Sequence, residues 1–327
     1  MDRPHFTPAL LHPRYWFTWL AIGLWVLVAH LPYGWQLSLG RQLGRFMQKF
    51  AKRRRVIAER NLALCFPEKS DEERAQLLHA NFDSMGIALM ETGMAWFRST
   101  AWIQKLFTLE GAEHLEGREQ GVVLLAMHFT TLEIGAGYLN SRFAIDGMYR
   151  AHKNPVYDYV QRKGREKHSR STRVYPREDV RGMMRALKGG RTVWYAPDQD
   201  YGIKQGVFAP LFGIQAATVT GTSRFARAGK AAVVPYCVER LPQGRGYCLR
   251  VYPQLEDIPS GDEYLDACSV NRFVEARLRE LPEQYMWVHR RFKTRPEGEA
   301  DVYGLPKRKR KRRRSREREK AVVSSKK

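Results

Sequence analysis

Short apolar runs and longer amphipathic stretches alternate through the body of this chain. Three runs predict buried strands, at 121–127 (GVVLLAM), 192–198 (TVWYAPD) and 231–239 (AAVVPYCVE), and a fourth predicts a strand of alternating character at 246–255 (GYCLRVYPQL). Apolar residues at helical spacing predict helices between them, near 131–141, 154–168, 178–188 and 215–229. Strands that alternate with helices predict an α/β fold, in which helices cover a sheet.

Two helix starts are marked by capping boxes, a serine followed three residues later by a glutamate. Ser70 and Glu73 predict the start of a helix that runs to about Met94. Ser260 and Glu263 predict the start of another, which runs to about Leu281.

The N-terminal region contains a long uncharged segment, with no Asp, Glu, Lys or Arg from Tyr15 to Gly40. A helix needs about 20 apolar residues to cross a bilayer. We therefore predict a transmembrane helix at 15–35, after a short N-terminal segment at 1–14. A cleaved signal peptide and a helix lying in the membrane interface remain alternatives.

Basic residues are concentrated after this segment, at Arg41, Arg45, Lys49 and 52–55. The positive-inside rule then predicts that the bulk of the chain lies in the cytoplasm. The four cysteines form no CxxC pair or zinc spacing, which favours free thiols in a reducing compartment.

The formal net charge of the 327 residues is +22, and the C-terminus carries much of it. We predict one folded domain at 36–300 and a basic, disordered tail at 301–327. Such a charge favours anionic partners: nucleic acid, acidic protein or lipid phosphates. A membrane-tethered nucleic-acid-binding protein is one alternative, but no RNA-recognition or zinc motif supports it.

Ionisable residues follow two of the predicted strands. His128 follows the first strand, and Asp198 and Asp200 follow the second. Because reactive groups collect at the carboxyl ends of strands in such sheets, these residues predict one shared site. Glu133 can reach His128 if the histidine lies in the loop and the glutamate lies in the first turn of the next helix.

In that arrangement Glu133 accepts an imidazole N–H, and His128 acts as a general base. The alternative is a histidine that only bonds to the backbone beside a solvated glutamate. No cysteine, histidine or carboxylate cluster has metal-ligand spacing, so no metal is predicted.

The His-x4-Glu spacing resembles the signature of glycerolipid acyltransferases. Five segments in order resemble the lipid A biosynthesis acyltransferases of Gram-negative bacteria, specifically the lauroyl type: MHFTTLE, MYRAHKNPVYDYVQRKGR, WYAPDQDYG, FAPLFG and QYMWVHRRFKTRP. The resemblance implies a glycerolipid-acyltransferase-like sheet behind the N-terminal transmembrane helix. It also implies an enzyme of the bacterial inner membrane that is single-pass and has its catalytic domain in the cytoplasm.

The implied reaction is transfer of a fatty acyl chain from acyl-acyl carrier protein to a hydroxyl of Kdo2-lipid IVA, without a cofactor. By the resemblance His128 removes the hydroxyl proton, Glu133 orients His128, and Arg165 and Asp198 are site residues. Arg150, in a basic cluster before and along the helix at 154–168, suits the acceptor's phosphates. The expected partners are acyl carrier protein, the lipid A precursor and inner-membrane lipids. A phospholipid-directed acyltransferase stays an alternative.

Overall fold

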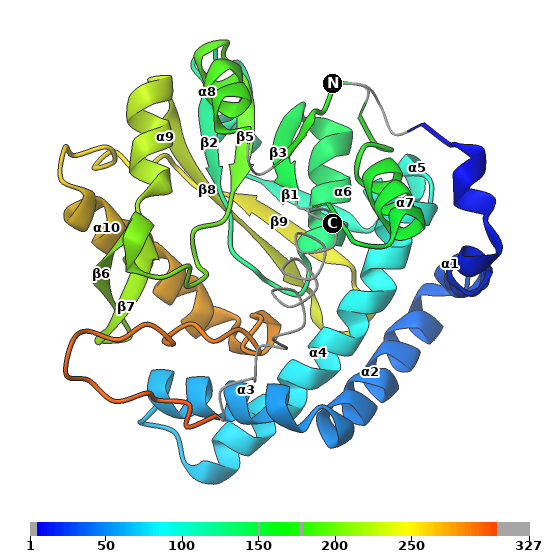
Figure 1. Cartoon of the computed structure of the whole chain (residues 1–327), viewed down its shortest axis with the longest axis horizontal. Helices are drawn as coiled ribbons and strands as arrows, with labels where there is room; N and C mark the ends of the chain where they lie inside the picture. The colour runs from blue at the N-terminus through cyan, green and yellow to red at the C-terminus, as the bar shows by residue number, and fades with distance from the viewer. Residues whose placement is uncertain (1–4, 150, 170, 177–178, 306–327) are drawn as a thin grey trace, which may run out of the picture.

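The computed structural model describes residues 5–149, 151–169, 171–176 and 179–305 (Figure 1). In this part of the chain, seven strands form one sheet in the order β1-β9-β8-β2-β5-β3-β4. Neighbouring strands are parallel except β8 and β9. The strands are β1 (Phe107–Glu110), β2 (Val122–Leu125), β3 (Ile145–Tyr149), β4 (Val174–Pro176), β5 (Thr192–Tyr195), β8 (Ala232–Arg240) and β9 (Tyr247–Val251).

The four predicted strands are confirmed as β2, β5, β8 and β9. All four residues of β2 are buried, as expected for a central parallel strand covered on both faces. The sequence pattern did not predict β1, β3 and β4. β1 alternates between half-buried and exposed residues, and β3 carries Asp146 and Gly147, residue types that are uncommon in strands.

Helices cover both faces of the sheet, and each face has its own apolar cluster. One cluster joins the sheet to α4, α6 and α7, and the other joins it to α8, α9 and α10. The α-helices are α1 (Trp16–Ala29), α2 (Tyr33–Phe50), α3 (Lys52–Cys65), α4 (Asp71–Phe97), α5 (Thr100–Gln104), α6 (Leu132–Arg142), α7 (Pro155–Arg165), α8 (Val180–Lys188), α9 (Gly221–Gly229) and α10 (Glu263–Glu280). The α/β prediction is therefore confirmed.

The helix predicted at 215–229 is wrong in its first part. Residues Ile214–Val219 form strand β7, which pairs antiparallel with β6 (Gly206–Leu211), and only Gly221–Gly229 is helical. Phe212 and Gly213 both have positive φ, the backbone of a tight two-residue hairpin turn. The turn reverses the chain, so the apolar residues after it continue a strand rather than open a helix.

One predicted capping box is confirmed, and the other is wrong. The Ser70 Oγ accepts the Glu73 N–H at 3.1 Å, and Glu73 accepts the Ser70 N–H at 2.7 Å at the start of α4. α10 begins at Glu263 instead of at Ser260. Its cap is Asp262, whose carboxylate accepts the Tyr264 N–H at 2.7 Å, because an aspartate directly before the helix reaches the free N–H groups.

The segment at 15–35, predicted as a single transmembrane helix, is divided between two helices. The chain forms α1, breaks at residues 30–32 and continues as α2. Pro32 is disfavoured inside a helix because it lacks an N–H, and it biases the residue before it away from helical geometry. The 14 residues of α1 extend about 21 Å, less than the roughly 30 Å of a bilayer core. Among the described residues, no helix has both the length and the apolar character needed to cross a membrane.

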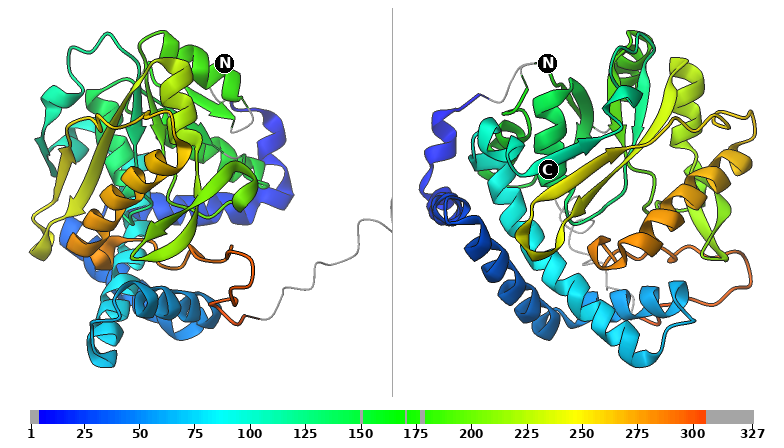
Figure 2. Two further views of the ribbon diagram at one scale, coloured as in Figure 1. Left: turned by 90° about the vertical axis from the view of Figure 1, so that its left-hand side faces the viewer. Right: turned by 180° about the vertical axis from the view of Figure 1, so that it is seen from behind.

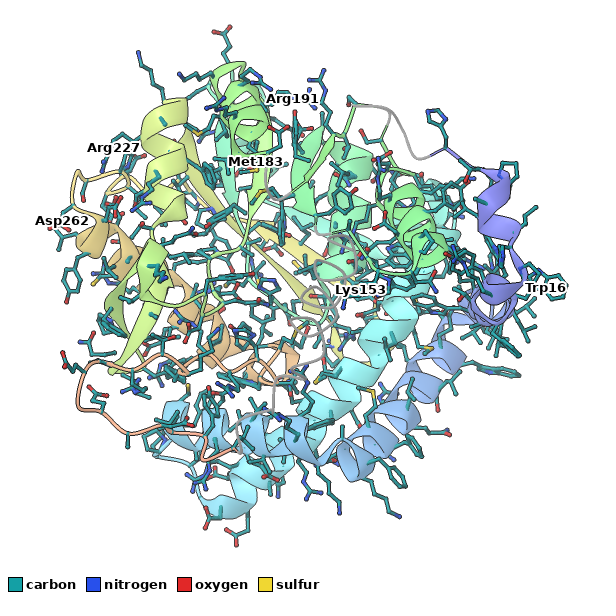
Figure 3. All side chains as sticks on the ribbon, in the orientation of Figure 1. Trp16, Lys153, Met183, Arg191, Arg227 and Asp262 are labelled. Atoms are coloured by element: carbon teal, nitrogen blue, oxygen red, sulfur yellow. The ribbon has the colours of Figure 1, made fainter. Side chains whose placement is uncertain are left out.

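α1 and α2 lie on the outside of α4 (Figures 1 and 2). Glycines let α2 and α4 approach closely: a Cβ atom at Gly40 would lie 2.7 Å from the Ile87 Cα. The outward side of α1 is apolar, with Phe17 85% and Leu20 71% exposed. Trp16 points away from the rest of the molecule (Figure 3).

The folded part continues beyond the domain boundary predicted at residue 300. Tyr303 is buried, and its hydroxyl donates to Asn61 Oδ1 at 2.7 Å and accepts the Phe292 N–H at 3.0 Å. Residues 306–327 of the predicted tail lie outside the described residues.

Candidate active site

His128 lies in the loop that joins β2 to α6, as predicted. The C-terminal part of the chain holds this loop in place. The Met286 N–H donates to the His128 carbonyl at 3.0 Å, and the Thr130 N–H donates to the Gln284 carbonyl at 2.7 Å. A segment some 150 residues away in the sequence thereby fixes the backbone on which the histidine stands.

Asp198, in the loop after β5, is the partner of His128. Its Oδ1 lies 2.6 Å from His128 Nδ1, and its Oδ2 accepts the His128 backbone N–H at 2.8 Å. The carboxylate is fully buried. Because a carboxylate only accepts, Nδ1 carries the hydrogen, and the Nε2 of the neutral ring is left to accept a proton.

The two groups shift each other's pKa in the directions expected for an ion pair. Burial lowers the pKa of His128, but the charge and hydrogen bond of Asp198 raise it more, so it lies above the ordinary value of 6.5. Burial raises the pKa of Asp198, but the charge of His128 and the hydrogen bonds lower it more. Asp198 therefore stabilises the protonated imidazole, the state that a general base reaches during reaction.

The hydrogen bond predicted between Glu133 and His128 is wrong. Glu133 lies in the first turn of α6, as predicted, but it pairs with Arg165 on α7. Arg165 Nε donates to Glu133 Oε2 at 3.2 Å, and Arg165 Nη2 donates to Oε1. The Trp96 indole N–H donates to Oε2 at 3.0 Å. The first turn of α6 directs the Glu133 side chain toward α4 and α7 and away from the loop that carries His128.

Arg165 ends α7, and it owes its fixed position to Glu133. Burial lowers the pKa of Arg165, but the charge and hydrogen bonds of Glu133 raise it more, so it lies above its ordinary value. The guanidinium is thus always charged. The other arginine expected at the site, Arg150, lies outside the described residues.

A cavity of about 540 Å³ brings His128, Glu133 and Arg165 together. Asp198 does not line it and stands behind His128. The rest of the wall is mostly apolar and comes from α2, α4, α6, the strands β3, β4 and β5, and the C-terminal segment: Met47, Met85, Ala88, Leu89, Leu132, Ala136, Leu139, Ile145, Gly147, Met148, Val174, Trp194 and Met286. The site joins one titratable base and one fixed cation to an apolar chamber, which suits a long alkyl substrate with a polar end.

Asp200 and His289 support the loop that carries Asp198. Asp200 accepts the Gly202 and Thr294 N–H groups, each at 2.8 Å, and its own N–H donates to His289 Nε2 at 3.2 Å. Burial lowers the pKa of His289 to about 4, so this ring is neutral and can accept. Asp200 is therefore a structural residue, although the sequence placed it beside Asp198 as a candidate.

The sequence did not predict a buried ion pair behind the His128 loop. Arg240 at the end of β8 donates to Glu91 on α4 through Nε at 2.6 Å and through Nη2 at 2.7 Å. It also donates to Ser84 Oγ at 2.7 Å, and Ser84 Oγ lies 2.8 Å from Thr130 Oγ1. Glu91 and Arg240 are 149 residues apart, and no local spacing signals their contact.

In the described ranges, no group of three or more His, Cys, Asp or Glu side chains is arranged to hold a metal ion.

The family model for the bacterial lipid A biosynthesis acyltransferases matches residues 3–294. The chain belongs to this family. It is therefore an acyltransferase of lipid A biosynthesis, as the five segments in the sequence implied.

Two lipid A acyltransferases agree with this assignment. The lipid A biosynthesis lauroyltransferase of Escherichia coli K12 is 46% identical over 304 residues, 92% of this chain and 99% of that protein. The palmitoleoyltransferase of the same organism is 40% identical over 91% of this chain and 98% of that protein. The 1-acyl-sn-glycerophosphate acyltransferase structure from Thermotoga maritima covers 75% of this chain and 97% of that one, at a TM-score of 0.35 and 15% identity.

Proposed function

We propose that this acyltransferase moves a fatty acyl chain of about lauroyl size from acyl-acyl carrier protein to a hydroxyl of Kdo2-lipid IVA. Similarity to a lauroyltransferase over nearly the whole chain supports the acceptor pathway and the chain size. The observation that carries the chemistry is the His128–Asp198 pair at an apolar cavity.

In this mechanism the acceptor hydroxyl gives its proton to His128 Nε2 while its oxygen attacks the thioester carbonyl carbon. The ester C–O bond forms, and the C–S bond to the carrier then breaks. The imidazolium returns the proton to the leaving thiolate, so the enzyme ends in its starting state. Asp198 accepts the Nδ1–H throughout and stabilises the charged ring.

Glu133 and Arg165 have a different role in the proposal. An arginine cannot give up its proton at neutral pH, so Arg165 takes no part in proton transfer. Its positive charge in the cavity wall instead holds an anionic group of the substrates, and Glu133 fixes its direction. A phosphate of the lipid A precursor has the charge and geometry that a guanidinium prefers.

We also propose that the enzyme lies on the cytoplasmic face of the inner membrane through α1 and α2. Both helices expose large apolar side chains on their outer sides: Trp16, Phe17, Leu20, Leu24, Leu27, Trp35, Leu39, Phe46 and Phe50. The exposed cations Arg45 and Lys49 stand on α2 beside them. Apolar side chains flanked by cations suit an interface with anionic lipid headgroups.

Vesicle flotation tests the membrane proposal. Phe17→Ser together with Leu20→Ser should reduce binding to vesicles that contain phosphatidylglycerol by at least fivefold. Val180→Ser, which removes an exposed apolar residue of α8, is the matched control and should leave binding unchanged. Equal binding of all three proteins would contradict the proposed surface.

The function is tested by offering the purified protein two acceptors side by side, Kdo2-lipid IVA and a lysophospholipid. Each is paired with lauroyl-acyl carrier protein, and His128→Ala is the control. Transfer to the lipid A precursor that the variant loses is the expected result. Transfer only to the lysophospholipid would agree with the acyl-transfer chemistry but contradict the proposed acceptor. It would support the alternative, a phospholipid-directed acyltransferase.

A further inference from the structure

One part of the cavity runs away from His128 between α6 and the sheet. Its wall on the helix is formed by Leu132, Ala136, Leu139 and Asn140, which share one face at helical spacing. From Leu132 to Leu139 this face extends about 10 Å along the helix axis. α6 connects β2 to β3, which run in the same direction. It therefore leads from the carboxyl ends of the strands, near His128, back toward their amino ends.

Polar residues mark the end of the cavity that lies furthest from His128. Asp146 is buried and pairs with Arg191 through two hydrogen bonds of 2.6 Å each. Thr172 Oγ1 donates to Asn140 Oδ1 at 3.3 Å. An alkyl chain gains nothing from contact with the Asn140–Thr172 pair, so the useful apolar length ends before it, while Arg191 holds the Asp146 carboxylate on the other face of β3.

Gly147 lies in the wall of this part of the cavity, on β3. It is paired with Trp194 on β5 and with Val174 on β4. A Cβ atom built on Gly147 would meet no atom within 4 Å. The buried Gly135 on α6 differs: a Cβ there would lie 2.7 Å from Val238 Cγ2, so packing requires a glycine at that position.

The backbone does not require a glycine at position 147 either. Gly147 is absent from the residues with positive φ, and it occupies an ordinary strand position. Side chains alternate along a strand, and Asp146 points to the face that holds Arg191. A side chain at 147 would therefore share the face of Ile145, which lines the cavity.

We propose that the missing side chain at Gly147 sets the length of the acyl chain that this enzyme accepts. The space left at this position holds the distal methylenes of the donor chain. The inference rests on the proposed function, because it assigns the donor chain to the part of the cavity under α6. It adds the residue that determines specificity within that site.

The test is a series of variants, Gly147→Ala, Gly147→Val and Gly147→Leu, assayed with acyl carrier proteins that carry C8 to C16 chains. The optimum should move to shorter chains as the side chain grows. For Gly147→Leu, kcat/KM should fall at least tenfold with the donor that the wild type prefers and stay within threefold with the shortest donor used. One methylene in an apolar pocket changes specificity by about 10- to 200-fold.

Two further variants complete the design. Ala144→Leu adds the same bulk at an exposed position three residues earlier and should leave the chain-length profile unchanged. Ile145→Val enlarges the cavity near its far end and should improve the relative rate with longer donors. If Gly147→Leu does not fold, Gly147→Ala replaces it in the test, because a single methyl group should already shift the chain-length profile.

An unchanged profile in an active Gly147→Leu protein, or an equal loss with every donor, would overturn the role of Gly147. The proposed function would survive either result. If the wild type transferred no chain of any length to the lipid A precursor, the proposed function itself would fail, so the two failures are distinguishable.

Discussion

The two charged pairs of the site, His128–Asp198 and Glu133–Arg165, have the same composition of one base and one carboxylate, but they behave differently. In the first pair the base is an imidazole that gains and loses a proton near neutral pH. In the second pair the base is a guanidinium that stays charged. The first pair can therefore transfer a proton, whereas the second can only hold charge in a fixed place.

The positions of the two carboxylates strengthen this contrast. Asp198 is fully buried behind the ring of His128 and does not line the cavity. Glu133 lines the cavity beside Arg165. One carboxylate acts on the catalytic group from behind, and the other acts on a group that faces the substrates. Mutations should separate the two functions, with effects that decrease in the following order.

His128→Ala should have the largest effect, because it removes the proton acceptor itself. We expect kcat to fall by about 10²- to 10⁴-fold, the usual contribution of a general base. Vesicle binding should stay close to that of the wild type. Turnover within a factor of three of wild type would remove His128 from the mechanism.

Asp198→Asn should have the next largest effect, with kcat lowered by roughly 10²-fold and KM little changed. The pH dependence should change as well. The carboxylate raises the pKa of His128, and the base must be neutral to act, so wild-type activity falls as the pH drops through that raised pKa. Without the carboxylate the pKa falls, and the acid limb of the profile moves to lower pH. An unmoved acid limb would argue that another group sets it.

Glu133→Gln should have the smallest effect on kcat, because His128 keeps its partner. The amide can still accept from Trp96, but it no longer forms an ion pair with Arg165, so the guanidinium loses its fixed direction toward the anionic group of the acceptor. We expect KM for the lipid acceptor to rise about tenfold and the acid limb of the pH profile to stay in place. Initial rates measured across acceptor concentrations at several pH values give both the KM for the acceptor and the position of the acid limb. A fall in kcat alone would show that Glu133 acts on the chemical step.

The sequence predicted the features of this molecule that depend on local patterns. The buried run at 121–127, the Ser70–Glu73 capping box and the location of His128 after a strand are signals within a few residues, and the structure confirms them. The apolar segment at 15–35 misled the prediction because its length was counted without the break before Pro32. Pro32 lies inside that segment, so the signal that separates α1 from α2 was already present in the sequence.

The partner of His128 could not be chosen from spacing. Glu133 is five residues away in the sequence and Asp198 is 70 residues away, and only the pairing of β2 with β5 brings Asp198 to the histidine. The sequence did predict that two strand ends share one site. It could not say which carboxylate would face the ring, since this depends on the direction of the first turn of α6.

The measurement that tests this account most directly is an NMR titration of the His128 ring in three proteins: wild type, Asp198→Asn and Glu133→Gln. The His128 resonance is assigned by its absence from His128→Ala. We predict a pKa above 6.5 in the wild type, a clearly lower value in Asp198→Asn, and a nearly unchanged value in Glu133→Gln. A pKa that falls in Glu133→Gln and stays constant in Asp198→Asn would contradict the account and assign the histidine to Glu133.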